Sequence, residues 1–231
     1  MAVNWTPPRL EPWRLARGLR KHPSAILLAV QLLGILSYPL MENTGAGRAL
    51  FGAMSIAVLS LVLWVVNRAS AHLVAWLLAV PSVCMSLLAN FAGMSELLPF
   101  AHALESILYF YAVAGLIRYM LGDLRVTTDE LVAAATTFTL LAWAFAYAYS
   151  ACQAWLPGSF SAITTPPQPR TWMELLFLSF STLSGVGLSD IVPLTPAARA
   201  LTMLAMFSGV MYIAIVVSRL IALTVIRQQH H

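Results

Sequence analysis

The fold is decided by residues 174–193, which read ELLFLSFSTLSGVGLSDIVP. An apolar run over residues 171–183 overlaps this stretch, and it is shorter than the roughly 20 residues that a bilayer-spanning helix needs. Two glycines two positions apart, then an acid and a proline, follow it. Non-helical backbone is tolerated at membrane depth only where it is buried or lines water. The pattern therefore predicts a re-entrant helix followed by an extended strand whose carbonyls face a water-filled axis.

The composition of the whole chain also indicates a membrane protein. Of the 231 residues, 60% are hydrophobic and only 10% are charged, whereas a soluble domain carries about 25% charged residues. The net charge of +4 does not indicate nucleic-acid binding, because the Lys and Arg residues lie in short segments between apolar runs. We therefore expect membrane lipid, and no nucleic acid, to surround this chain. The two cysteines, Cys84 and Cys152, lack metal-ligand spacing and are predicted to be packing residues.

Six apolar runs are long enough to cross a membrane as helices. The fifth and sixth enclose the re-entrant segment, so residues 126–231 are predicted to form one domain, after a four-helix peripheral region of residues 24–125. Residues 1–23 are predicted to be a cytoplasmic segment containing an interfacial helix, because basic and apolar residues alternate there. The predicted spans are residues 24–41, 47–66, 70–91, 98–121, 129–155 and 196–226.

The distribution of basic residues predicts the orientation of the chain. Ten of them lie before the first span or beside the ends of the second, fourth and sixth spans, and three lie on the other side. Since positive charge favours the cytoplasmic side, both termini are predicted to be cytoplasmic. That arrangement requires an even number of spans, in agreement with six.

The flanks of the re-entrant segment carry a family resemblance. The residues that carry it are Phe180, Thr182, Leu183, Asp190-Ile191-Val192-Pro193, Thr195-Pro196-Ala197-Ala198-Arg199 and Gly209, which follows Val186 by 23 positions. They resemble the pore of potassium channels, and the whole chain resembles small bacterial six-span ion channels. The resemblance implies an all-α membrane protein with six transmembrane helices, a re-entrant pore helix and a filter strand. It also implies a homotetramer around a central pore and a location in the bacterial inner membrane.

The filter itself departs from the family pattern. The family's T-V-G-Y-G falls on residues 185–189, where Gly185 replaces threonine, Leu188 replaces tyrosine and Ser189 replaces a left-handed glycine. The resemblance therefore implies a pore for monovalent cations, K⁺ or Na⁺, with weakened K⁺ selectivity. Two alternatives stay open: a K⁺-selective channel with a variant filter, and a non-conducting membrane sensor or regulatory protein with a degenerate pore.

The resemblance assigns roles to residues of the predicted pore. Carbonyls of Gly185, Val186, Gly187 and Leu188 are expected to coordinate monovalent cations, with Ser184 and Ser189 bounding the sites. Asp190 and Glu174 are expected to line the outer rim, and Ser208-Gly209 is expected to be the bending point of the last helix. Helical spacing places Met206, Val210, Ile213 and Val217 on one face with Thr202, and this face is predicted to line the inner vestibule and gate.

Few other residues suggest chemistry. His102 and Glu105 lie three positions apart on one face of the fourth span, so they form a candidate pH-sensing pair, with an interfacial polar pair as the alternative. The same span carries only Arg118, which predicts no steep voltage dependence. No enzyme motif occurs, and we expect neither a cofactor nor a soluble regulatory domain.

Overall fold

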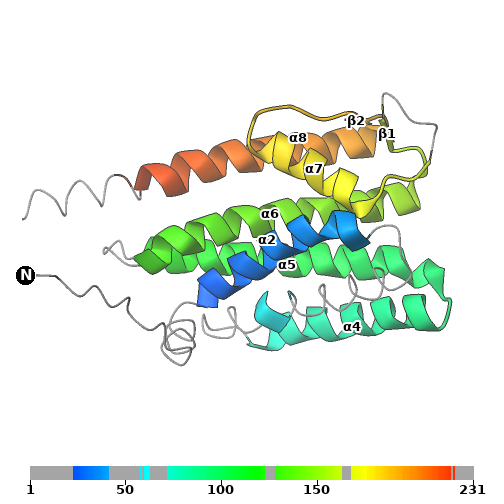
Figure 1. The fold of residues 1–231 in the computed structure, drawn as a ribbon, viewed down its shortest axis with the longest axis horizontal. Coiled ribbons are helices and arrows are strands. Elements are labelled where there is room, and N and C mark those ends of the chain that lie inside the picture. Colours follow the sequence, from blue (N-terminus) through cyan, green and yellow to red (C-terminus); the bar gives the residue numbers. More distant parts are fainter. Residues whose placement is uncertain are drawn as a thin grey trace, which may run out of the picture.

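The computed structural model describes residues 23–41, 58, 60–62, 72–122, 128–162, 168–219 and 221. Its long helices run roughly parallel, with α8 on one side, α4 on the other, and α6 and α5 between them (Figure 1). In chain order the elements are α2 (Pro23–Met41), α4 (His72–Phe91), the 3₁₀-helix η1 (Ser95–Leu97), α5 (Leu98–Gly122), α6 (Thr128–Trp155), β1 (Phe160–Ala162), α7 (Trp172–Leu183), β2 (Ile191–Pro193), α8 (Pro196–Tyr212) and the π-helix η2 (Ile213–Val217).

Helices occupy five of the six predicted spans. The second predicted span, residues 47–66, lies mostly outside the described residues, as does the predicted interfacial helix within residues 1–23. Among the described helices, Ser95–Gly122, Leu131–Trp155 and Pro196–Val217 have the length and apolar composition to cross a membrane. Ser24–Tyr38 and Leu73–Ala89 are apolar but shorter. The described part of the chain is therefore largely helical with three candidate membrane spans, and the count of six stays a prediction.

Helix α6 is the centre of the fold. It packs against α2, α5, α7 and α8, and every side chain from Leu140 to Tyr147 is buried. Alanines alternate with large residues along this stretch, and small side chains let neighbouring backbones approach closely in membranes. Polar bonds hold α2 to it: Thr136 Oγ1 donates to Ser24 O at 2.9 Å and Thr139 Oγ1 donates to Gln31 Oε1 at 2.7 Å. A helix packed on all sides is a rigid support for whatever α7 and α8 carry.

A small sheet that the sequence did not predict closes one end of the molecule. Strand β1 follows α6 and pairs antiparallel with β2, which precedes α8, in the register Phe160↔Pro193 and Ala162↔Ile191. Leu194 N also donates to Ser159 O at 2.8 Å. The sheet therefore ties the end of α6 to the start of α8, on either side of α7 in the chain.

Candidate conduction pathway

Helix α7 lies where the re-entrant helix was predicted. At 12 residues it is about 18 Å long, against a hydrocarbon core of about 30 Å. It packs beside α8 and on α6 (Figure 1), with Leu175, Leu176 and Leu183 buried and Ser179 Oγ donating to Ala142 O of α6 at 2.8 Å. A helix of this length is too short to cross the bilayer, as the prediction of a re-entrant helix requires.

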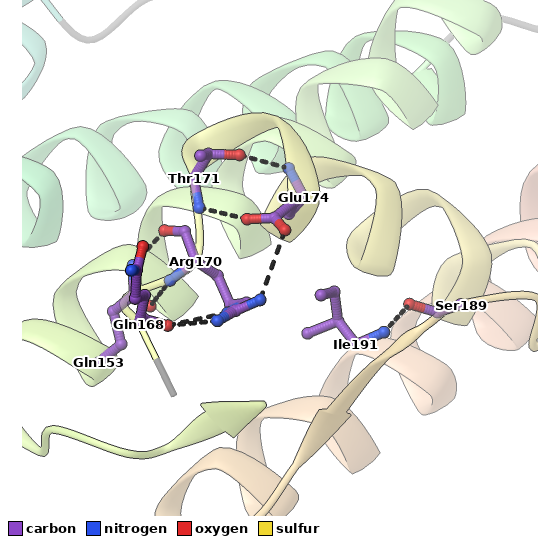
Figure 2. Close-up of polar contacts among 7 residues, drawn as sticks. All are labelled: Gln153, Gln168, Arg170, Thr171, Glu174, Ser189 and Ile191. Atoms are coloured by element: carbon purple, nitrogen blue, oxygen red, sulfur yellow. Dashed lines mark hydrogen bonds and ion pairs between the residues drawn. The ribbon is translucent and has the colours of Figure 1, made fainter. Parts of the chain in front are cut away.

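The start of α7 is fixed by polar contacts within the chain (Figure 2). Thr171 and Glu174 form a capping box, in which Thr171 N donates to Glu174 Oε2 at 2.6 Å and Glu174 N donates to Thr171 Oγ1 at 3.3 Å. Gln153 of α6 exchanges two hydrogen bonds with the backbone of Arg170, at 2.8 and 2.9 Å. These bonds satisfy donors that a helix start leaves unpaired. They also attach α7 to α6.

Glu174 was predicted to belong to the outer rim of the pore, and its carboxylate has structural partners. Besides the capping box, Glu174 Oε1 lies 3.6 Å from the guanidinium of Arg170. Arg170 is 5% exposed and donates through Nε and Nη2 to Gln168 O at 2.9 and 2.6 Å. Asp190, the other predicted rim residue, is exposed. Of the two acids, Asp190 has the carboxylate that faces solvent without a basic partner among the described residues.

The C-terminal end of α7 is terminated by a glycine. Ser184 is the C-cap with α-helical dihedrals, and Gly185 follows with φ of 73°. Gly185 N donates to Thr182 O at 3.3 Å, and Gly187 N donates to Ser181 O at 3.2 Å. A left-handed glycine after the C-cap commonly ends helices in this way. Threonine, the family's residue at position 185, disfavours that conformation because it is β-branched.

The filter segment, residues 184–189, is irregular backbone exposed to solvent in the single chain. No residue of it is paired in a sheet, and the filter strand expected from the sequence stays a prediction. Gly187, like Gly185, has a positive φ, of 70°. Val186 is 71% exposed and Leu188 is 69% exposed. Ser189 Oγ accepts from Ile191 N at 3.1 Å, which leads the chain into β2 (Figure 2). Two large apolar side chains thus find no cover in their own chain.

The beginning of α8 is hydrogen-bonded to the turn that follows α6. Thr195 is its N-cap and accepts from Ala198 N at 3.3 Å, while the hydroxyl of Thr195 lies 3.0 Å from that of Ser159. Ser159 Oγ also donates to Leu156 O at 2.6 Å. Together with the sheet, these hydrogen bonds connect the two ends of the segment that contains α7 and the filter segment. No sequence motif predicted these hydrogen bonds.

Helix α8 presents two faces. Ala198, Thr202, Ala205, Gly209 and Tyr212 are buried against the rest of the chain. Met206, Val210, Ile213 and Val217 are between 38% and 59% exposed. Thr202, at 3% exposure, does not share the exposed face with which the sequence grouped it. The four exposed positions keep the spacing predicted for a vestibule lining.

Gly209, predicted as a bending point, is a point of close contact. A Cβ atom added there would lie 2.0 Å from Leu183 O and 2.6 Å from Leu183 Cα, so the backbone of α8 touches the end of α7. The α-helix continues through Ser208 and Gly209 to Tyr212, whose hydroxyl donates to Ala134 O of α6 at 2.5 Å. The irregular part of the helix is η2, four residues further on, and π-turns are frequent at functional sites.

The candidate pH-sensing pair lies in the peripheral part of the chain. Glu105 is 4% exposed and accepts from Ser86 Oγ of α4 at 3.3 Å. His102 is partly buried, with its ring 5.6 Å from that of Tyr147, and it lines a pocket of about 600 Å³ between α5 and the end of α6. The same pocket is lined by Trp172 of α7 and by Leu194, which follows β2, and its lining does not include residues 184–189.

A short apolar helix, an exposed irregular loop after it and a long apolar helix on either side are the elements that the resemblance to a channel pore implied. The chain matches a family model described as "Ion channel" over residues 106–225, slightly more than half of its length. The chain therefore belongs to this ion channel family, and the predicted potassium-channel-like pore family is confirmed. The match includes most of α5, all of α6, α7 and α8, and the filter segment. No curated protein and no solved structure matches the chain.

Proposed function

We propose that four copies of this chain assemble around an axis and pass monovalent cations between their filter segments. The observation that carries the proposal is the exposure of Val186 and Leu188, 71% and 69%, shortly after a 12-residue apolar helix. Large apolar side chains in contact with water are costly, about 25 cal/mol per Å². Neighbouring copies would cover them, and the family resemblance supports four.

The direction of α7 favours a cation at the filter segment. The C-terminal end of a helix carries a partial negative charge of about half an electron, and α7 ends at Leu183, one residue before that segment. One irregular loop cannot surround an ion, whereas carbonyls from several copies can replace its hydration shell. Asp190, exposed at the far end of the segment, would add negative charge at the rim that attracts cations.

The same residues support weak discrimination between K⁺ and Na⁺. Gly185 supplies no hydroxyl at the innermost site, and Leu188 cannot donate the hydrogen bond that tyrosine makes in the family. The side-chain hydrogen bonds of the filter segment are at its two ends, where Ser184 donates to Ser181 O and Ser189 accepts from Ile191 N. The side chains of residues 185–188 therefore offer no hydrogen bond that would fix the distance between opposing carbonyls. A compliant ring of carbonyls adapts to the smaller ion as well as to the larger one.

Reversal potentials test this proposal directly. The purified chain is placed in planar bilayers with K⁺ on one side and Na⁺ on the other. We expect K⁺ to be preferred by less than about tenfold, a difference of about 1.4 kcal/mol. Strong K⁺ preference would instead support the variant K⁺-selective channel, and absence of cation flux would support the non-conducting sensor or regulator.

A glycine variant with a matched control assigns any current to the filter segment. Gly187→Ala places a Cβ at φ of 70°, which costs about 1–2 kcal/mol per chain, and we expect it to reduce the conductance severely. Gly93→Ala introduces the same strain at φ of 72° in the link between α4 and α5, and it should conduct normally. Equal currents from both variants would show that ions do not pass along residues 184–189.

A further inference from the structure

A carboxyl group is buried inside one of the candidate membrane spans, away from the filter segment. Glu105 lies on α5, well inside the span Ser95–Gly122, and it is 4% exposed. Its Oε1 atom accepts a hydrogen bond from Ser86 Oγ of α4 at 3.3 Å. It forms no ion pair within the part of the chain that the structure describes. Since a buried carboxylate without a cation is costly, this packing accommodates Glu105 in its neutral, protonated form.

The elements around Glu105 bring no fixed positive charge close to it. Helix α4 contains no Asp, Glu, Lys or Arg, and the acids of α6, Asp129 and Glu130, lie in its first turn. Arg118 of α5 is 13 positions further along the helix, which corresponds to about 20 Å. The other titratable side chains near Glu105 are Cys84 of α4, the exposed Glu96 of η1, His102 and Tyr109 of α5, and Tyr147 of α6.

Two further hydroxyl groups follow along the same contact between α4 and α5. The short link of residues 92–97 joins these helices, which pack side by side and run in opposite directions (Figure 1). The contact of Ser86 with Glu105 is therefore followed, one helical turn along, by Ser82 and Tyr109. Both side chains are fully buried, and neither hydroxyl has a hydrogen-bond partner in the described structure. An ionised Glu105 would attract such donors, because hydrogen bonds to charged groups are the stronger ones.

Tyr109 belongs to a group of packed aromatic rings that reaches the start of α7. Its ring stacks on that of Tyr147 of α6, with centroids 5.5 Å apart and planes inclined by 14°, and meets Trp143 edge-on at 6.2 Å. These two rings of α6 lie 5.6 and 4.8 Å from the ring of Trp172, the first residue of α7. Close-packed interiors transmit strain. A displacement of Tyr109 therefore acts on the packing that supports α7.

We propose that Glu105 is a proton-binding site through which pH regulates this channel. The protonated form keeps the packing described above. When the O–H bond dissociates, the proton passes to water in the pocket of about 600 Å³ that His102 lines, one helical turn from Glu105. The remaining charge attracts Tyr109, which loosens the rings against Trp172 and weakens the support of α7. Proton binding itself is independent of the proposed channel function, whereas its effect on current rests on that function.

The test is Glu105→Gln, which keeps the size of the side chain and cannot ionise. We expect the wild-type cation current in planar bilayers to fall by about fivefold or more between about pH 5 and about pH 9. Glu105→Gln should keep its low-pH current throughout. The matched controls are His102→Gln and Glu96→Gln, and both should respond to pH as the wild type does. A response that survives in Glu105→Gln, or that disappears in His102→Gln, would overturn the inference.

Thermal unfolding of the purified protein tests proton binding without a current. A group that holds its proton in the folded state more strongly than in the unfolded chain stabilises the fold at low pH, and this stabilisation is lost as pH rises. The unfolding temperature of the wild type should therefore fall relative to that of Glu105→Gln as pH is raised. An equal response of the two proteins would overturn the inference. This thermal response without cation flux in any variant would support the proton site and overturn the proposed function instead.

A second variant tests the route to α7. Tyr109→Leu removes the ring that lies between Glu105 and α6 and leaves Glu105 in place. We expect its thermal stability to depend on pH as in the wild type, with a weaker dependence of the current. A current as sensitive to pH as that of the wild type would overturn the aromatic route.

Discussion

The two ends of α7 are built in opposite ways. The start is closed within the chain by the Thr171–Glu174 capping box, the Gln153 hydrogen bonds and the buried Arg170. The other end leads through Gly185 into a segment whose apolar side chains lie in the open. The difference indicates that the N-terminal end of α7 is stabilised by contacts within its own chain. In the proposed assembly, the other end is the site that neighbouring copies of the chain complete.

The largest effect is expected where the second end meets α8. Gly209→Ala would place a Cβ 2.0 Å from Leu183 O, so α7 or α8 must shift. Overpacking of this kind costs about 3 kcal/mol per chain, and we expect loss of both thermal stability and cation flux.

Gly115→Ala is the control for that substitution. Gly115 lies inside α5 with nothing within 4 Å of an added Cβ, and alanine is the better helix former by up to about 1 kcal/mol. The control should therefore be as stable as the wild type or slightly more stable. Equal stability of the two variants would mean that α7 and α8 do not touch at Gly209.

The next largest effect is expected at the N-terminal end of α7. Gln153→Leu removes both hydrogen bonds to the Arg170 backbone and leaves those two groups unpaired, at a cost of about 2 kcal/mol. We expect a lower unfolding temperature with an unchanged permeability ratio. Gln168→Ala, an exposed neighbour whose carbonyl rather than side chain accepts from Arg170, should change stability by less than about 0.5 kcal/mol.

A smaller effect on stability, with a larger one on ion flow, is expected at Gly185. Gly185→Ala places a Cβ at φ of 73° with no steric conflict, so only the left-handed strain of about 1–2 kcal/mol applies. We expect altered conductance measured in single channels and a modest loss of stability. Gly158→Ala, at φ of 80° in the turn before β1, carries similar strain and should keep the conductance of the wild type.

The smallest effect is expected from the helix cap. Thr171→Ala removes the acceptor for Glu174 N, which costs about 1 kcal/mol. Thermal unfolding should record this loss, and reversal potentials should not move. A change of selectivity in this variant would erase the distinction between the two ends of α7.

The sequence predicted the helices well and the connections between them poorly. The apolar runs predicted α6 and α7 to within a residue or two. Bilayer thickness fixes the length of a span such as α6, and the shorter run of α7 lies between the polar residues Thr171 and Ser184. The strands β1 and β2 were missed, since three residues are too few to display an alternating pattern. The family alignment identified residues 184–189 but assigned Gly185 to the filter only, whereas its dihedral angle makes it also the end of α7.

The other structural features that were not predicted from the sequence are contacts between positions far apart in the chain. Gln153 bonds to Arg170, 17 positions away, and Ser179 bonds to Ala142, 37 positions away, and neither relation has a local spacing rule. Helical spacing did place Thr202 near Met206, because positions four apart differ by only about 40° around a helix, and only burial separates them. Gly209 was predicted to be a hinge from its distance to the filter in the sequence. Its close packing against Leu183 was not predicted, because it depends on the positions of two backbones.

The exposure of Val186 and Leu188 has a consequence for the cell that makes this protein. In the proposed assembly an ion path exists only where four loops have met, and a newly inserted chain contributes one loop with nothing opposite it. Single chains that have not yet assembled would not conduct ions, so the membrane potential would be preserved during synthesis. Leakage would begin only with the complete channel, whose opening can then be controlled.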